Sequence, residues 1–143
     1  MRRLEDGDRF EVGDIGLKCF DIHSLKEPQY GFVATMPDGK RVCCLGDEPY
    51  NPQNRQYAER ADWLMSEAFC LYEDRDRFRP YEKNHSTALD AAELAEDLQV
   101  GNLLLYHTED LTLDTRKERY TAEAKTRFRS QVWVPEDLER IDL

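Results

Sequence analysis

Residues 85–107 have the sequence HSTALDAAELAEDLQVGNLLLYH, which predicts one helix followed by one buried strand. Ser86 or Thr87 can cap a helix that runs through Leu98, because a hydroxyl oxygen at this position accepts a free backbone N–H. The apolar positions of the helix form one narrow face of small residues: Ala88, Ala91, Ala92, Ala95 and Leu98. Such a face packs closely on a sheet. Residues 102–106 are an apolar run that indicates a buried strand.

The first half of the chain has the pattern of short strands, at residues 9–12 and 17–21. Two further strands, 30–36 and 40–45, flank the turn sequence Pro37-Asp38-Gly39 and predict a hairpin. Residues 61–69 fit a strand or a short helix equally well. We therefore expect a strand-rich first half.

The second half alternates helix and strand. A helix is expected over residues 116–129, with Tyr120, Ala124 and Phe128 on one side, and short strands over 131–134 and 138–143. This order of elements is typical of a mixed α/β layered domain. We expect residues 1–143 to form one such domain.

The composition limits the function classes. The chain has 143 residues and a formal net charge of -10, which disfavours a general binder of nucleic acid. No apolar stretch approaches the roughly 20 residues that cross a membrane, so we expect a soluble, cytoplasmic protein. The four cysteines, Cys19, Cys43, Cys44 and Cys70, form no C-x-x-C pair and are expected to be reduced thiols.

Only three histidines occur, and two of them follow apolar strands. His23 and His107 come after strand-like runs, and Asp47 follows the second strand of the predicted hairpin. Imidazole and carboxylate are the ligands of catalytic zinc and of related metals, so these three residues are candidate metal ligands. The alternatives are a turn aspartate and histidines whose nitrogens are satisfied by backbone carbonyls.

His85 is the candidate catalytic residue. It precedes a helix N-terminus, a location that suits a proton donor beside a phosphate or a leaving oxygen. Glu67 is a candidate to orient the imidazole of His85, as carboxylates commonly do. The alternative is that His85 is an exposed residue at the start of a helix.

Taken in order, these features resemble the second half of the metallo-β-lactamase superfamily, in particular its ribonuclease Z-like branch. The similar segments are Asp21-Ile22-His23-Ser24, Tyr30-Gly31-Phe32, Gly39-Lys40-Arg41, Leu45-Gly46-Asp47, 61–69, His85-Ser86-Thr87, 91–95 and 103–107. The resemblance implies a layered αββα sandwich, of which this chain would be the C-terminal half.

The resemblance also implies a chemistry. His23 would ligate one metal ion, Asp47 would bridge two, His107 would ligate the second, and His85 would donate a proton. A metal-bound hydroxide would hydrolyse a phosphodiester or similar ester. Zinc is the expected metal, in a two-metal site of the complete fold, and manganese or iron would also suit these ligands.

The chain departs from the family pattern in two respects. The His-x-His-x-Asp-His motif that forms the family's main metal cradle is absent, so Met1 resembles a start inside the fold and the isolated chain is expected to be inactive. The interval between His23 and Asp47 is too short for the long arm with which ribonuclease Z grips transfer RNA. We therefore expect a small phosphoester or related ester as the substrate, with nucleic acid as an alternative that the charge does not support. We also expect either a homodimer or pairing with a missing N-terminal half. The alternative is a non-catalytic half-fold that acts as an interaction module.

Overall fold

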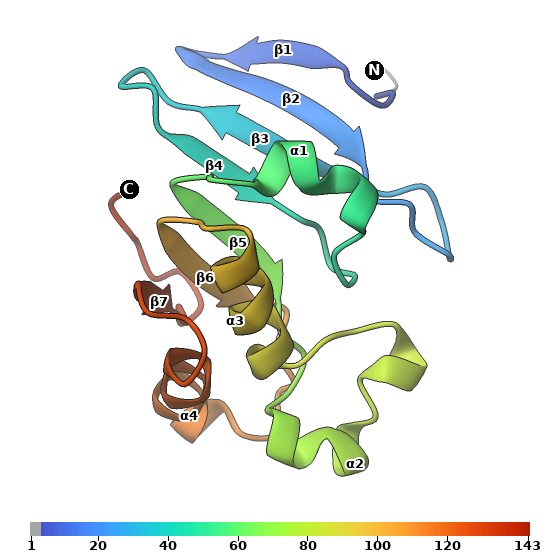
Figure 1. Cartoon of the computed structure of the whole chain (residues 1–143), viewed down its shortest axis with the longest axis vertical. Helices are drawn as coiled ribbons and strands as arrows, with labels where there is room; N and C mark the ends of the chain where they lie inside the picture. Colours follow the sequence, from blue (N-terminus) through green and yellow to red (C-terminus); the bar gives the residue numbers. More distant parts are fainter. Residues whose placement is uncertain (1–3) are drawn as a thin grey trace.

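The computed structural model describes residues 4–143 as one twisted sheet with helices packed on one of its faces (Figure 1). The sheet has seven strands in the order β1-β2-β3-β4-β5-β6-β7, so each strand lies beside its neighbours in the chain. The strands are β1 (Arg9–Val12), β2 (Ile15–Asp21), β3 (Tyr30–Thr35), β4 (Arg41–Cys44), β5 (Trp63–Glu67), β6 (Asn102–Tyr106) and β7 (Gln131–Trp133). The helices are α1 (Arg55–Ala58), α2 (Arg75–Phe78), α3 (Ala88–Asp97) and α4 (Leu113–Lys125), with 3-10 turns at Pro52–Asn54, Tyr72–Asp74 and Tyr81–Lys83.

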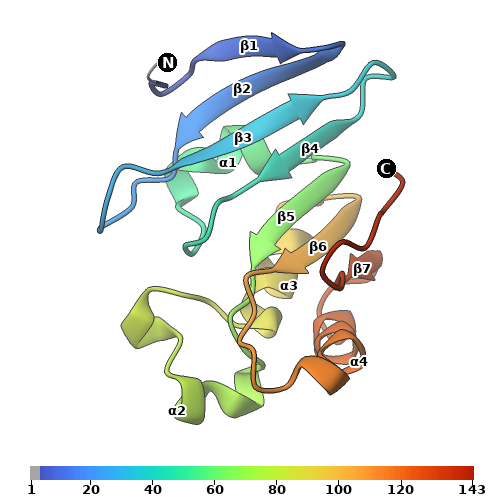
Figure 2. The same cartoon turned by 180° about the vertical axis from the view of Figure 1, so that it is seen from behind.

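The direction of the strands changes at β4. Strands β1 to β4 are antiparallel, whereas β4 to β7 are parallel and are joined by helical crossovers. Such crossovers are almost always right-handed, so parallel strands that follow chain order carry their helices on one face. Accordingly α1, α3 and α4 lie on one face, and no helix of the described residues lies on the opposite face (Figure 2).

The main core lies between the sheet and these helices. The predicted small-residue face of α3 is buried there, together with Leu98, and Thr87 forms a capping box with Asp90. Helix α4 contributes Tyr120 and Ala124, and Phe128 follows it. The strands contribute large side chains to the same core, among them Phe20, Val33, Cys43, Leu64, Leu103 and Leu105.

The helix-free face carries a second, smaller apolar cluster. Ala34, Val42 and Trp63 are buried there, and partly buried side chains surround them: Ile15, Leu17, Phe32, Met36, Met65 and Ile141. Trp133 of β7 lies beside Trp63, with ring centroids 6.0 Å apart. Ile141 comes from the C-terminal segment, so among residues 4–143 this segment and the strands' own side chains cover the face.

Most of the expected elements are confirmed, including the hairpin and the helix capped by Thr87. Residues 61–69 contain a strand, β5. The strand expected over residues 138–143 is wrong, because this segment has no regular structure and Leu138 has a left-handed backbone with φ 64°. The helix expected over residues 116–129 is α4, which begins three residues earlier, at Leu113, and ends at Lys125.

The thiols are unpaired, as expected: Cys19, Cys43 and Cys70 are buried and Cys44 is partly buried. Burial raises the pKa of Cys43 to about 12, so this thiol is protonated at neutral pH. Within residues 4–143, no helix is both long and apolar enough to cross a membrane.

Gly31 is required by the packing of β3. A Cβ atom there would lie 2.4 Å from Cζ of Phe20 and 2.6 Å from the carbonyl oxygen of Cys44. We predict that Gly31→Ala lowers the free energy of unfolding by about 1–3 kcal/mol, measured by urea denaturation. Gly16→Ala in β2 is the matched control, because a Cβ atom there meets no atom within 4 Å. Equal effects of the two substitutions would contradict this account.

Candidate functional site

The candidate residues lie at one edge of the sheet. Strand β2 runs in the same direction as β4, because both are antiparallel to β3, and β5 and β6 are parallel to β4. The carboxyl ends of these four strands therefore meet at one edge, as they do in functional sites of open α/β sheets. We call the loops that follow β2, β4, β5 and β6 the carboxyl edge.

Glu67 and His85 form a buried pair at this edge. The side chain of Glu67 is 1% exposed, and its Oε2 atom lies 3.5 Å from Nδ1 of His85. Its other oxygen, Oε1, accepts a hydrogen bond of 2.6 Å from the backbone N–H of Ser86. Oε2 of Glu67 and Nδ1 of His85 have no hydrogen-bond partner among the described residues. A single proton shared between the two atoms would satisfy both of them if they moved slightly closer together.

Burial shifts the pKa values of Glu67 and His85 in opposite directions. Desolvation raises the pKa of Glu67 to about 7, although the hydrogen bonds from Ser86 oppose this shift. Desolvation lowers the pKa of His85, and the charge of His107 lowers it further. A carboxyl group with a pKa of about 7 beside an imidazole whose pKa is lowered can hold a proton at neutral pH and pass it to the imidazole, which is the property that general acid–base catalysis requires.

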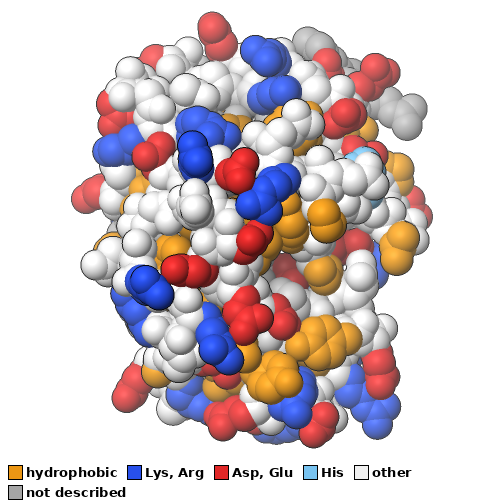
Figure 3. Space-filling model, viewed as in Figure 1, with side chains coloured by type: hydrophobic (Ala, Val, Ile, Leu, Met, Phe, Trp, Pro, Cys, Tyr) orange, Lys and Arg blue, Asp and Glu red, His pale blue; other side chains and the backbone are white. Residues whose placement is uncertain are grey.

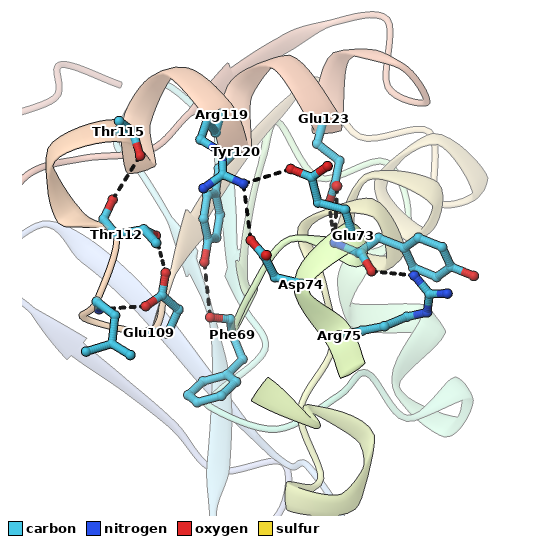
Figure 4. Close-up of polar contacts among 12 residues, drawn as sticks. Phe69, Glu73, Asp74, Arg75, Glu109, Thr112, Thr115, Arg119, Tyr120 and Glu123 are labelled. Carbon is cyan, nitrogen blue, oxygen red and sulfur yellow. Dashed lines mark hydrogen bonds and ion pairs between the residues drawn. The ribbon is translucent and has the colours of Figure 1, made fainter. Parts of the chain in front are cut away.

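The His85 ring is held by two other rings. Phe69 stacks on it with centroids 5.0 Å apart and an interplanar angle of 18°, and the ring of His107 lies 5.0 Å away at 38°. The Phe69 carbonyl accepts hydrogen bonds from Tyr120 Oη at 3.1 Å and from the backbone N–H of Glu109 at 2.7 Å. Figure 4 shows Tyr120 of α4 pointing at this carbonyl. Helix α4 therefore fixes the loop that supports His85.

The loop after β4 is joined to its neighbours by Glu48. This buried carboxylate accepts hydrogen bonds from Ser24 Oγ at 2.8 Å and from Asn84 Nδ2 at 2.7 Å. Asp47, the candidate ligand beside it, is partly buried and close enough to raise the pKa of His85. Glu48 thus brings three loops of the carboxyl edge together.

His23 and His107 are exposed rather than partly buried, and both have left-handed backbone conformations, with φ of 60° and 53°. Asn84 is also left-handed, with φ 59°. Non-glycine residues rarely adopt this conformation, and it is often retained at functional sites. His23 lies on the loop of Ser24, and its backbone N–H donates to Asp21 Oδ1 at 2.7 Å.

The donors at this edge fit a divalent metal in kind but not in number. The structure brings His107 to His85, and Asp47 lies close enough to His85 to act on its pKa, whereas His23 lies on an adjoining loop. Among residues 4–143, no group of three or more His, Cys, Asp or Glu side chains could hold a metal ion. The two unpartnered polar atoms, Oε2 of Glu67 and Nδ1 of His85, face each other, and a proton between them would give both a hydrogen bond. The described residues therefore do not form a metal centre by themselves.

Three residues at this edge were missed by sequence reasoning. Glu48 stands next to Asp47, and its burial gives no local signal in the sequence. Phe69 has the pattern of a core aromatic. Tyr106 is buried enough to raise its pKa, and its hydroxyl donates to the carbonyl of Gly46.

The raised pKa of Glu67 predicts a pH dependence of stability. A carboxyl group whose folded pKa lies above its unfolded value of 4.5 contributes most below that pH, and this contribution is lost as the pH rises toward about 7. Glu67→Gln does not titrate. As the pH rises from about 5 to 8, the free energy of unfolding of this variant should therefore increase relative to that of the wild type by on the order of 1–3 kcal/mol.

This difference is measured by urea denaturation of both proteins in the presence of a chelator. His85 is present in both, so its own titration largely cancels in the comparison. Two stability curves that stay parallel across this pH range would show that Glu67 has an ordinary pKa.

The chain is similar to curated relatives and to solved structures, although no protein-family model matches it. It is 31% identical over 141 residues to a ribonuclease Z of Pyrobaculum neutrophilum, covering 99% of this chain and 45% of the relative. A ribonuclease Z of Streptococcus suis is 33% identical over 112 residues, covering 78% of this chain and 35% of the relative. The chain thus spans about half the length of these relatives or less.

The solved structures agree on the fold. The metallo-β-lactamase fold protein YhfI of Bacillus subtilis has a TM-score of 0.74 at 23% identity, covering 93% of this chain and 52% of that one. The short form of human tRNase Z has a TM-score of 0.67 at 24% identity, covering 93% of this chain and 45% of that one. Both the fold class and the expected resemblance are confirmed. The chain has about half of the metallo-β-lactamase fold, and its sequence is similar to those of the ribonuclease Z relatives over that part.

Proposed function

We propose that this chain supplies about half of the active site of a metal-dependent phosphodiesterase. The observation that carries the proposal is the buried pair of Glu67 and His85 beside His107 at the carboxyl edge. In this proposal His85 donates a proton to the leaving oxygen, and Glu67 returns one to Nδ1 of His85. His23, Asp47 and His107 are the proposed metal ligands contributed by this chain, and residues 1–143 act as one domain.

The names of the relatives favour an RNA phosphodiester as the substrate, in place of the small phosphoester expected from the sequence. The relatives are called ribonuclease Z, and one solved neighbour is a tRNase Z. The net charge of -10 requires that cationic groups at the site bind the phosphates. Zinc is the proposed metal, because PqqB of Methylobacterium extorquens has a TM-score of 0.69 in its Zn²⁺-bound form. The expected cytoplasmic location stays a prediction.

The remaining ligands are proposed to come from a second polypeptide segment on the helix-free face of the sheet. This face exposes part of an apolar cluster, including Trp133, which is 37% exposed. The relatives are about twice as long as this chain, which supports a partner that carries the other half of the fold. Pairing with a second copy of this chain is the alternative arrangement.

The second candidate function is a non-catalytic interaction module. It is favoured by one observation, the lack of a three-ligand metal group among residues 4–143. The two functions differ in metal uptake, which is therefore measured first.

We predict that the chain binds Zn²⁺ tightly only when it is mixed with the half of a ribonuclease Z relative that it does not match. The mixture should then cleave a phosphodiester, and His85→Ala should lower turnover by roughly 10²–10⁴-fold with little change in bound zinc. The Asp47→Ala variant should lose both the bound zinc and the turnover. The readouts are metal content after gel filtration and turnover of bis(p-nitrophenyl) phosphate.

Arg129→Gln is the control, because its side chain is 92% exposed and it follows α4, away from both the carboxyl edge and the helix-free face. Full turnover after Asp47→Ala would refute the hydrolase assignment. A mixture that forms a complex without zinc uptake would support the interaction module.

Tryptophan emission reports the pairing separately from activity. The chain has two tryptophans, Trp63 and Trp133, and both belong to the helix-free face. Covering this face should shift their emission to shorter wavelength as the second half is added. Trp133→Phe should remove most of the shift, because Trp63 is already buried. An unchanged spectrum in a complex detected by gel filtration would place the contact elsewhere.

A further inference from the structure

A second concave site lies at the opposite end of the strands from the carboxyl edge. It is a cavity of about 680 Å³ between α1 and the strands β1 to β4, on the face of the sheet that carries the helices. Arg9, Lys18 and Arg41 line it, together with the apolar side chains of Val33 and Tyr57. Its volume falls within the range of about 300–1,000 Å³ found for small-molecule sites.

The cations of this cavity lack carboxylate partners. Arg9 and Lys18 are directly opposite each other in β1 and β2, where like charges destabilise a sheet. Among residues 4–143, nine other Lys and Arg residues form ion pairs, but no carboxylate pairs with Arg9, Lys18 or Arg41. Other described cations also lack an ion pair, so the distinguishing feature of this site is that three such side chains line one cavity.

Two of the three cations, Arg41 and Lys18, are also held in place. Arg41 donates to the carbonyl oxygens of Tyr57 at 2.8 Å and Glu59 at 3.3 Å, so it is fixed against α1. Lys18 Nζ lies 4.6 Å from the centroid of the Tyr57 ring. Phe20 stacks on the same ring with centroids 4.5 Å apart. With Phe20 and Lys18 both against it, the Tyr57 ring has little free surface for a base to stack on, and charge becomes the main means of recognition.

Figure 3 shows the helix-bearing face, where Lys and Arg side chains gather over the strands near α1. Glu11 also lines the cavity, in the row next to Arg9 and Lys18, and it limits the total negative charge that a ligand can bring. The combination of fixed cations, aliphatic wall and single carboxylate fits a ligand with one phosphate and an apolar body.

We propose that this cavity binds a small organic phosphate of about the size of a nucleoside monophosphate, with its phosphate between Arg9 and Lys18. Two adjacent cations favour a phosphate because its hydrogen bonds are charge-assisted. Binding would also relieve the repulsion between the two side chains. The site is separate from the carboxyl edge and does not depend on the proposed hydrolase activity.

Isothermal titration with adenosine monophosphate tests the proposal, in low salt and with a chelator present. Saturable binding is expected, with no binding of adenosine and weaker binding of inorganic phosphate. Arg9→Gln and Lys18→Gln should each weaken the affinity by about tenfold. The matched control Arg140→Gln should leave the affinity unchanged.

A second readout keeps the test independent of folding. Arg9→Gln removes one of two opposed like charges, so its melting temperature without ligand should be no lower than that of the wild type. Adenosine monophosphate should raise the melting temperature of the wild type. It should not raise that of the double variant that carries both Arg9→Gln and Lys18→Gln. Absence of saturable binding, or equal binding by the double variant, would overturn the proposal. Binding of a short single-stranded RNA, but not of the mononucleotide, by the same cations would overturn it as well.

Discussion

The direction of four strands is the constraint on which the rest of the structure depends. Because β2, β4, β5 and β6 point the same way, the loops after them open at one edge, although the chain separates their residues widely. The buried Glu67 and the exposed His107 meet there because β5 and β6 are adjacent and in register, with Glu67 opposite Tyr106. His85 joins them from the segment that leads into α3. The same strand order places the helices on one face, and so leaves the other face for a partner.

Sequence patterns predicted the elements that depend on local chemistry. The alanine face of α3 and its capping box follow from side-chain size and hydroxyl groups, and the turn at Pro37-Asp38-Gly39 follows from backbone preference. The strand expected over residues 138–143 fails for a tertiary reason. A short apolar pattern becomes a strand only where a free sheet edge pairs with it, whereas here Ile141 packs across the sheet face.

The candidate site was predicted in its residue types and less well in its geometry. Histidine and glutamate identities suggested the pairing of Glu67 with His85, and the structure places them 3.5 Å apart. The roles of Glu48 and Phe69 were not predictable, because they depend on burial and on the distance between loops far apart in the sequence. Exposure of His23 and His107 was also missed, since both follow apolar runs that are buried only up to the strand end.

The electrostatics of the chain are compatible with the two proposed sites for anionic groups, although the chain is acidic. At the carboxyl edge, burial raises the pKa of Glu67 to about 7, so at neutral pH this carboxyl group carries only part of its negative charge beside the proposed phosphate site. At the other end of the sheet, nearly all of the surrounding acids are kept out of the cavity that Arg9 and Lys18 line. The net charge of a protein affects the diffusion and long-range steering of a ligand. Recognition depends on the charged side chains within a few ångströms of the bound ligand. The formal charge of -10 therefore argues against extended contact with a nucleic acid and leaves room for binding of a single phosphate.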